Sequence, residues 1–409
     1  MAKHVTVRFG GGDAIVSPFR VTGYADMVWA DVPTDVVVMP ARVIGNAAVL
    51  VPVNPNDDTA YQEGAIAGKA AVFEATPVTT PGGGYKQRTA QWFTADSYWR
   101  TPLPDNATVH PNSATILHYI AVDGPNYENS SADNTYLNLT NTSWACPVYW
   151  AVPGDPQYHV PWTGYPANRP PEHDNIRIPY EAAPSSNSDA QFVLYDVERG
   201  YVSTFQAATY DAAHNTWTTS GGSLAYLASN GLERRVTQTP WHEGSDDDRN
   251  MGSQRGNSGA HFYVGWEMLK NAAANGGDLG HIHKIALGSF FREDYIAPTV
   301  GSDGKMPTSS PWYQEAPKNG TRFRIKPSVV LTGKGLSPSA LALARTFQKY
   351  GVYLGDSSGS TTNLKMENLS VRDDLSPIPT WASVGITSTT MSIFPFMRDW
   401  EVISETYWP

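Results

Sequence analysis

Apolar runs bounded by turn residues recur along most of the chain and predict short β-strands. Residues 191–197 and 201–207 form two such runs, and the Glu-Arg-Gly sequence between them predicts a hairpin. Residues 280–287 alternate, residues 322–325 form another short run, and residues 352–359 end in a turn of small residues. This is the pattern of a β-rich domain.

Two segments carry the signals of α-helices instead. Residues 258–270 begin with Ser258 as the expected N-cap, and a Gly-Gly pair stops the run. Residues 337–350 have Ser at the N-cap, Pro at the first helical position and Gly immediately after the end. The β-rich domain is therefore expected to carry two short-to-medium helices.

The first 88 residues read as a separate small β-domain, because four short apolar runs precede a Pro- and Gly-rich linker at residues 79–84. The runs are residues 5–9, 35–40, 47–53 and 70–75. We predict a mainly β chain with an attachment domain at residues 1–88. A large, jelly-roll-like β-sandwich follows it at residues 89–409.

Composition supports a β-rich chain and narrows its partners. Only 17% of residues are charged, whereas the chain has 35 Gly, 31 Pro, 13 Trp and 21 Tyr, a mixture typical of many turns and strands. The formal net charge of −10 argues against nucleic acid, since phosphate binding needs a basic surface. A weakly charged partner such as a carbohydrate fits better.

The cysteine count and the hydropathy argue against a disulfide-bonded protein and against a membrane-spanning one. The single Cys146 rules out an intrachain disulfide. No apolar stretch approaches the roughly 20 residues of a membrane span, so no membrane insertion is expected. Residues 1–9 lack the apolar core of a signal peptide. We therefore expect synthesis in a cytoplasm and release by lysis or within an assembly.

Carboxylates offer the most plausible catalytic chemistry. Glycoside hydrolysis uses two carboxyl groups about 5 to 9.5 Å apart, and the candidates are Asp189, Asp196, Glu267, Asp303 and Asp356. His281 and His283 fall on one face of their strand and could assist as an acid/base pair. The catalytic candidates are Asp189, Glu267, His283 and Asp303.

The same residues also have ordinary structural interpretations. Asp303 and Asp356 precede Gly and Ser and are typical turn formers. Glu267 fits a helix surface, and the two histidines fit a hydrogen-bonded pair. A metal site from these histidines with Asp303, Glu267 or the acidic run 246–248 is conceivable, but the spacing is not specific. We expect no metal and no cofactor.

Aromatic residues on predicted loops suggest sugar binding. Sugar rings present apolar C–H faces that stack on indole rings, while nearby polar side chains bond the hydroxyls. The candidates on loops are Trp162, Trp241 and Trp312. Other tryptophans are expected in the core, since Trp is highly buried on average.

From Trp92 onward, the order of motifs resembles that of a family of uncharacterised β-sandwich proteins from bacteria and phages. The matching pieces lie at residues 97–103 (SYWRTPL), 111–114, 188–196, 258–267, 280–282, 303–304, 322–328, 348–351 and 356–359 (DSSG). The resemblance, from Trp92 to the end, covers about three-quarters of the chain. The sequence departs from the family at Gln191 and Lys284, where the family tends to carry histidine.

Taken with the small N-terminal domain, the resemblance implies a minor tail protein of a tailed phage that infects actinobacteria. Such a protein would be located in the virion, contact other tail proteins and host cell-wall polysaccharide, and form a homo-oligomer such as a trimer. A glycan-degrading enzyme, either a glycosidase or a polysaccharide lyase, is the alternative. A purely architectural tail component is a third possibility.

Overall fold

A computed structural model describes residues 28–31, 41–44, 47–50, 69–72, 92–123, 135–236, 244–252, 255–359, 361–372, 375 and 377–407. The chain divides into two compact units, residues 1–84 and 85–409. The described strands of the first unit form two antiparallel pairs, β1 (Val28–Asp31) with β4 (Lys69–Val72) and β2 (Ala41–Ile44) with β3 (Ala47–Leu50). The strands predicted at residues 5–9 and 35–40 lie outside the described residues.

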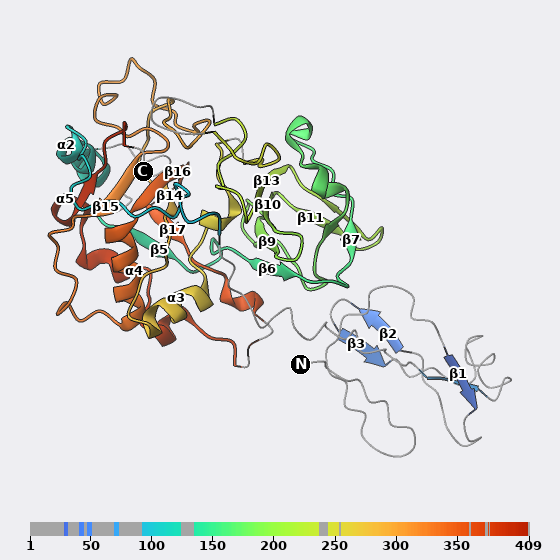
Figure 1. The fold of residues 1–409 in the computed structure, drawn as a ribbon. Coiled ribbons are helices and arrows are strands. Elements are labelled where there is room, and N and C mark those ends of the chain that lie inside the picture. The colour runs from blue at the N-terminus through green and yellow to red at the C-terminus, as the bar shows by residue number, and fades with distance from the viewer. Residues whose placement is uncertain are drawn as a thin grey trace. The chain divides into compact units, whose positions relative to one another are not determined.

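The second unit contains a six-stranded mixed sheet, which confirms a mainly β fold (Figure 1). Its strands, in spatial order, are β18 (Trp400–Val402), β15 (Arg322–Ile325), β16 (Val352–Ser357), β14 (His283–Leu287), β17 (Asn363–Lys365) and β5 (Asn138–Thr140). The central strands β14 and β16 are parallel. Four helices are described in this unit: α2 (Ser113–His118), α3 (Trp266–Ala274), α4 (Pro338–Lys349) and α5 (Phe396–Asp399).

A four-stranded sheet forms the second lobe of this unit (Figure 1). Its order is β13 (Gly221–Tyr226), β10 (Tyr201–Gln206), β9 (Phe192–Asp196) and β6 (Val148–Ala151). The predicted hairpin is confirmed, since β9 and β10 pair antiparallel. Two small antiparallel pairs accompany the sheet: β7 (Gln157–Tyr158) with β8 (Ile176–Arg177), and β11 (Thr209–Asp211) with β12 (Thr216–Thr218).

An aromatic core joins the two sheets. It contains Trp150 and Tyr195 from the four-stranded sheet, Tyr353 from the six-stranded sheet, and Trp92 and Trp99 from the segment before α2. A second core lies between the six-stranded sheet and helices α3 and α4, and a third covers the other face of the four-stranded sheet. The two sheets therefore share one continuous interior.

Local sequence explains where α4 begins and ends. The Ser337 hydroxyl accepts a hydrogen bond from the Ala340 N–H (3.1 Å), and Pro338 occupies the first turn. Gly351 ends the helix with φ of 77°, a left-handed conformation that favours glycine. The helix predicted at residues 337–350 is confirmed within one residue at each end.

The other predicted helix begins later than expected. Ser258 does cap a turn, but this is a short 3₁₀ turn (Gly259–His261). The chain then extends through Gly265, and α3 starts at Trp266, whose N–H donates to the distant Glu367 carboxylate (2.7 Å). A carboxylate 101 residues away supplies this cap, which is why local sequence placed the start too early.

The sheet topology differs in detail from a jelly roll, which is antiparallel throughout. Three strand pairs are parallel: β14 with β16, β6 with β9, and β5 with β17. Helices also cover one face of the larger sheet, where a sandwich would place a second sheet. Among the described residues, none of the helices has the length and apolarity needed to cross a membrane.

Candidate functional site

A β-bulge at the end of β16 changes the face of the sheet on which the Asp356 carboxylate lies. Leu354 pairs with Ile285, but the next pairing joins Asp356 to Ala286, so Gly355 is an extra residue. In a regular strand Asp356 would share a face with Leu354, which belongs to the core under the helices. The bulge turns Asp356 to the opposite face, the one on which Lys284 lies.

Glycine is required at the bulge because the Lys284 side chain passes directly over it. A Cβ added at Gly355 would lie 2.5 Å from Lys284 Cγ and 2.9 Å from Asn257 Oδ1. The Asn257 amide also donates to the Gly355 carbonyl (2.8 Å), and its Oδ1 accepts from the Tyr353 hydroxyl (2.9 Å). These contacts hold the bulge and its lysine in one arrangement.

Asp356 belongs to a group of six charged residues that we call the carboxylate cluster: Asp189, Arg255, Lys284, Asp303, Asp356 and Lys365. At its centre, Arg255 bridges two carboxylates, with Nη1 2.9 Å from Asp303 Oδ2 and Nη2 3.0 Å from Asp356 Oδ1. The Lys284 ammonium lies 2.8 Å from Asp356 Oδ2 and 3.6 Å from the centre of the Phe262 ring.

The two central carboxylates are close together. The Ser357 backbone N–H lies 3.0 Å from Asp303 Oδ2 and 3.1 Å from Asp356 Oδ1, which places these oxygens within about 6 Å of each other. The Ser357 hydroxyl also donates to Asp303 (2.8 Å). Both side chains keep some solvent access, at 18% for Asp303 and 22% for Asp356.

Their surroundings move the pKa values of the two aspartates in opposite directions. Burial raises the pKa of Asp303, and the Asp356 charge adds to this against the opposing Arg255 charge. Burial alone would also raise the pKa of Asp356, but Arg255 and Lys284 lower it overall. Divergent pKa values in a neighbouring pair are typical of acid/base sites, although structural ion pairs produce them too.

The cluster extends to a more exposed edge. Lys365 lies 3.5 Å from Asp189 Oδ2, and the Asp189 side chain is 37% exposed. Burial alone lowers the pKa of Arg255, but Asp356, Asp303 and then Asp189 raise it, so Asp189 belongs to the same electrostatic group. Two predicted residues, Asp189 and Asp303, therefore both act on the same arginine.

Glu267 lies elsewhere, in the first turn of α3. Both of its oxygens accept from the Arg372 guanidinium, which also bonds Glu367 Oε1 (3.1 Å). Arg372 is buried, so this pair fixes the start of α3 to the chain after β17. The predicted catalytic role of Glu267 beside Asp303 is not supported by this placement.

His283 is buried in the aromatic core and is not part of the carboxylate cluster. Its ring centroid is 4.3 Å from that of His281, which confirms the predicted common face. The His281 ring lies 4.0 Å from Trp92, and His261 lies 4.2 Å from Trp99. Burial lowers the pKa of His281 to about 4 and the pKa of His261 and His283 well below the ordinary value. Neutral imidazoles packed among rings are typical core residues, so the acid/base role predicted for His283 is not supported by this placement.

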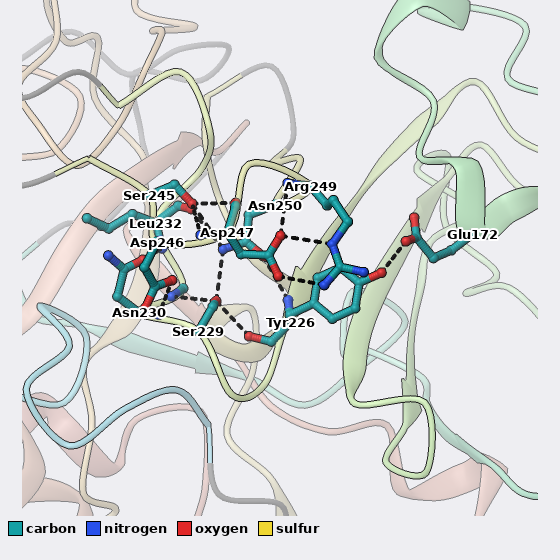
Figure 2. A network of polar contacts seen from close by, with 11 residues as sticks. Glu172, Tyr226, Ser229, Asn230, Leu232, Ser245, Asp246, Asp247, Arg249 and Asn250 are labelled. Carbon is teal, nitrogen blue, oxygen red and sulfur yellow. Dashed lines mark hydrogen bonds and ion pairs between the residues drawn. The ribbon is translucent and has the colours of Figure 1, made fainter.

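Asp246 and Asp247 of the acidic run 246–248 belong to a separate polar network, shown in Figure 2. Both Asp246 oxygens accept from the Asn230 N–H (2.8 Å each), and Asp247 pairs with Arg249 (2.9 Å). The Arg249 guanidinium lies 3.8 Å from the centre of the Tyr226 ring, whose hydroxyl donates to Glu172. Tyr226, Asp246, Asp247 and Arg249 line a hollow of about 200 Å³ together with Ala228 and Ser229.

No metal site is formed by the candidates considered. Within the described part of the chain, no three His, Cys, Asp or Glu side chains come together as ligands for a metal ion. Asp246 and Asp247 bond Asn230 and Arg249, and the histidines lie in the aromatic core. The hypothesis of a histidine–aspartate metal site is therefore wrong for these residues.

The three tryptophans predicted to bind sugar have different positions. Trp162 is buried, because a β-bridge to Thr219 draws its loop onto the four-stranded sheet and its Nε1 donates to His173 (3.0 Å). The expectation of an exposed ring is wrong there. Trp312 is 39% exposed and keeps a ring available. Trp241 lies outside the described residues.

Sequence analysis missed three of the six cluster residues. Arg255 and Lys365 lie in no sequence motif that predicts a binding or catalytic role. Lys284 stands out only as a departure from the resembling family, which tends to carry histidine there. Asp356 was considered as a carboxylate but not chosen. Comparisons of this chain with family models, curated proteins and solved structures find no match.

Proposed function

We propose that this chain binds a polysaccharide of the bacterial cell envelope through the carboxylate cluster. The observation that carries the proposal is the pair Asp303 and Asp356, held within about 6 Å by a shared Arg255 on which the exposed Asp189 also acts. Carboxylates accept hydrogen bonds from hydroxyl groups, and a few fixed polar groups are what orient a ligand in a binding site.

Binding fits this geometry better than catalysis does. Both Asp356 oxygens are neutralised, one by Arg255 and the other by Lys284, and its pKa is lowered. A carboxylate in that state is a weak base and a weak nucleophile. Lys284 also occupies a position where the resembling family tends to carry histidine.

Hydrolysis of the same glycan is the second candidate, favoured by one observation. A separation within about 6 Å falls below the range of about 6.5 to 9.5 Å used by inverting glycosidases and admits the retaining distance. Asp303, whose pKa is raised, would be the acid in such a reaction.

The binding proposal predicts a selective effect of Asp189. Replacing Asp189 with alanine is expected to weaken binding about 10-fold, because a charged acceptor for sugar hydroxyls is lost. Affinity electrophoresis in gels containing purified cell-wall arabinogalactan measures this. Asp174→Ala is the matched control, since Asp174 is also exposed and paired to a cation, Arg169. Equal weakening by both variants would contradict the proposal.

Hydrolysis is tested with the same polymer in solution. The expected result is retention without release of oligosaccharides, measured by chromatography after prolonged incubation. Release that stops in Asp303→Asn would instead establish the second candidate. Release that persists in Asp303→Asn would exclude the cluster as its source.

The biological setting proposed is the tail of a phage. The support is the resemblance over residues 97–359 together with an acidic, aromatic-rich composition. In that setting the chain is a homo-oligomer that contacts other tail proteins. Sedimentation of the purified protein tests the first part, and its presence in purified particles tests the second. A strict monomer absent from particles would contradict this setting.

A further inference from the structure

An exposed indole ring lies at the edge of the carboxylate cluster. Among the tryptophan side chains that the structure describes, Trp144 and Trp312 are the exposed ones, at 44% and 39%. The Lys365 ammonium lies 5.9 Å from the centre of the Trp144 ring and 3.5 Å from Asp189 Oδ2. One lysine therefore connects the ring to the exposed carboxylate.

Asn187 fixes the position of Trp144 relative to Asp189. Its amide Nδ2 donates to the Ser143 carbonyl (2.9 Å), immediately before Trp144. Its Oδ1 accepts from the Asp189 N–H (2.9 Å). A single side chain thus ties the two loops together, so the ring and the carboxylate are presented as one surface.

The charges of the cluster balance. Three carboxylates, Asp189, Asp303 and Asp356, oppose the three cations Arg255, Lys284 and Lys365. Asp303, Arg255, Asp356 and Lys284 form one chain of ion pairs, and Lys365 with Asp189 forms a second pair. A site without net charge gives no long-range attraction to an anionic polymer. It suits a ligand whose own groups are neutral hydroxyls, for which charged donors and acceptors are strong partners.

We propose that Trp144 is the platform on which a sugar ring of an uncharged polysaccharide stacks, with its hydroxyls bonded by Asp189 and Lys365. This inference rests on the proposed function and names its ligand class and its aromatic contact. An amphipathic indole gives a rigid apolar face at small entropic cost, and the neighbouring ion pair supplies one acceptor and one donor.

The test compares Trp144→Ala with Trp312→Ala in the full chain. The probes are arabinogalactan, which is uncharged, and hyaluronan, which is anionic, in affinity electrophoresis. We expect Trp144→Ala to bind arabinogalactan about tenfold more weakly, Trp144→Phe to retain most of the affinity, and Trp312→Ala to lose less affinity than Trp144→Ala. The wild type is expected to favour arabinogalactan over hyaluronan.

Near-ultraviolet circular dichroism of each variant verifies the fold, which should persist because Trp144 is exposed. Unchanged binding by Trp144→Ala, with weakened binding by Asp189→Ala, would overturn the platform and leave the proposed function standing. Equal weakening by Trp144→Ala and Trp312→Ala, or a preference for hyaluronan, would also overturn this inference. No binding of either polymer by the wild type would overturn the proposed function itself.

Discussion

Replacing Arg255 with alanine is expected to lower the free energy of unfolding of the second unit by about 3–5 kcal/mol, the usual cost of removing one partner from a buried ion pair. The side chain is 11% exposed and bonds both Asp303 and Asp356. Without it, two carboxylates within about 6 Å would face each other with Lys284 as the remaining close cation. Urea unfolding followed by tryptophan fluorescence measures the loss.

Arg249→Ala is the matched control for this experiment. Arg249 also pairs with an aspartate, Asp247, but its side chain is 54% exposed, so a loss of about 1 kcal/mol or less is expected. Adding Asp303→Asn to Arg255→Ala should recover part of the loss, because one of the two opposed charges is removed. If both arginine variants lose a similar free energy of unfolding, the carboxylate cluster does not stabilise the end of β16.

Acidification below pH 6.5 is expected to destabilise the second unit steeply. Burial lowers the pKa of four histidines, to about 3 for His173 and about 4 for His281, and well below the ordinary value for His261 and His283. As pH falls, the four histidines therefore take up protons in the unfolded chain before they do so in the folded chain. The stability that the neutral histidines contribute is complete above pH 6.5 and is lost as pH falls toward 4 and then 3. Four such groups give a slope of about 5 kcal/mol per pH unit.

Urea unfolding midpoints at pH 7.5, 6.5 and 5.5 test this, in a range above the titration of ordinary carboxyl groups. His261→Phe should reduce the slope by about 1.4 kcal/mol per pH unit, because one buried imidazole is replaced by a ring of similar shape. A midpoint that stays constant over this range would contradict the expectation.

Elements whose signals are local were predicted well from the sequence. The helix α4 has its cap, its proline and its terminal glycine within one stretch, and β15 coincides with its predicted residues. The start of α3 was predicted too early because its cap comes from Glu367, far along the chain. Trp162 was misplaced for a similar reason, since a bridge to Thr219 buries it. Contacts between residues far apart in the sequence determine both the start of α3 and the burial of Trp162.

The carboxylate cluster was only partly predictable. Asp189 and Asp303 were predicted for their chemistry, and both act on Arg255 in the structure. Glu267 and His283 were chosen on the same grounds but lie in an ion pair and in the aromatic core. The sequence shows which carboxylates the chain has but not where they lie in the fold. Only the structure shows that Arg255 lies between Asp303 and Asp356.

The bulge at Gly355 means that the site depends on a residue count. Without the bulge the strand would alternate regularly, and Asp356 would point toward the interior beside Ile285 and Leu354, leaving Lys284 without its counter-ion. Any relative that keeps the site must also keep the phase of this strand.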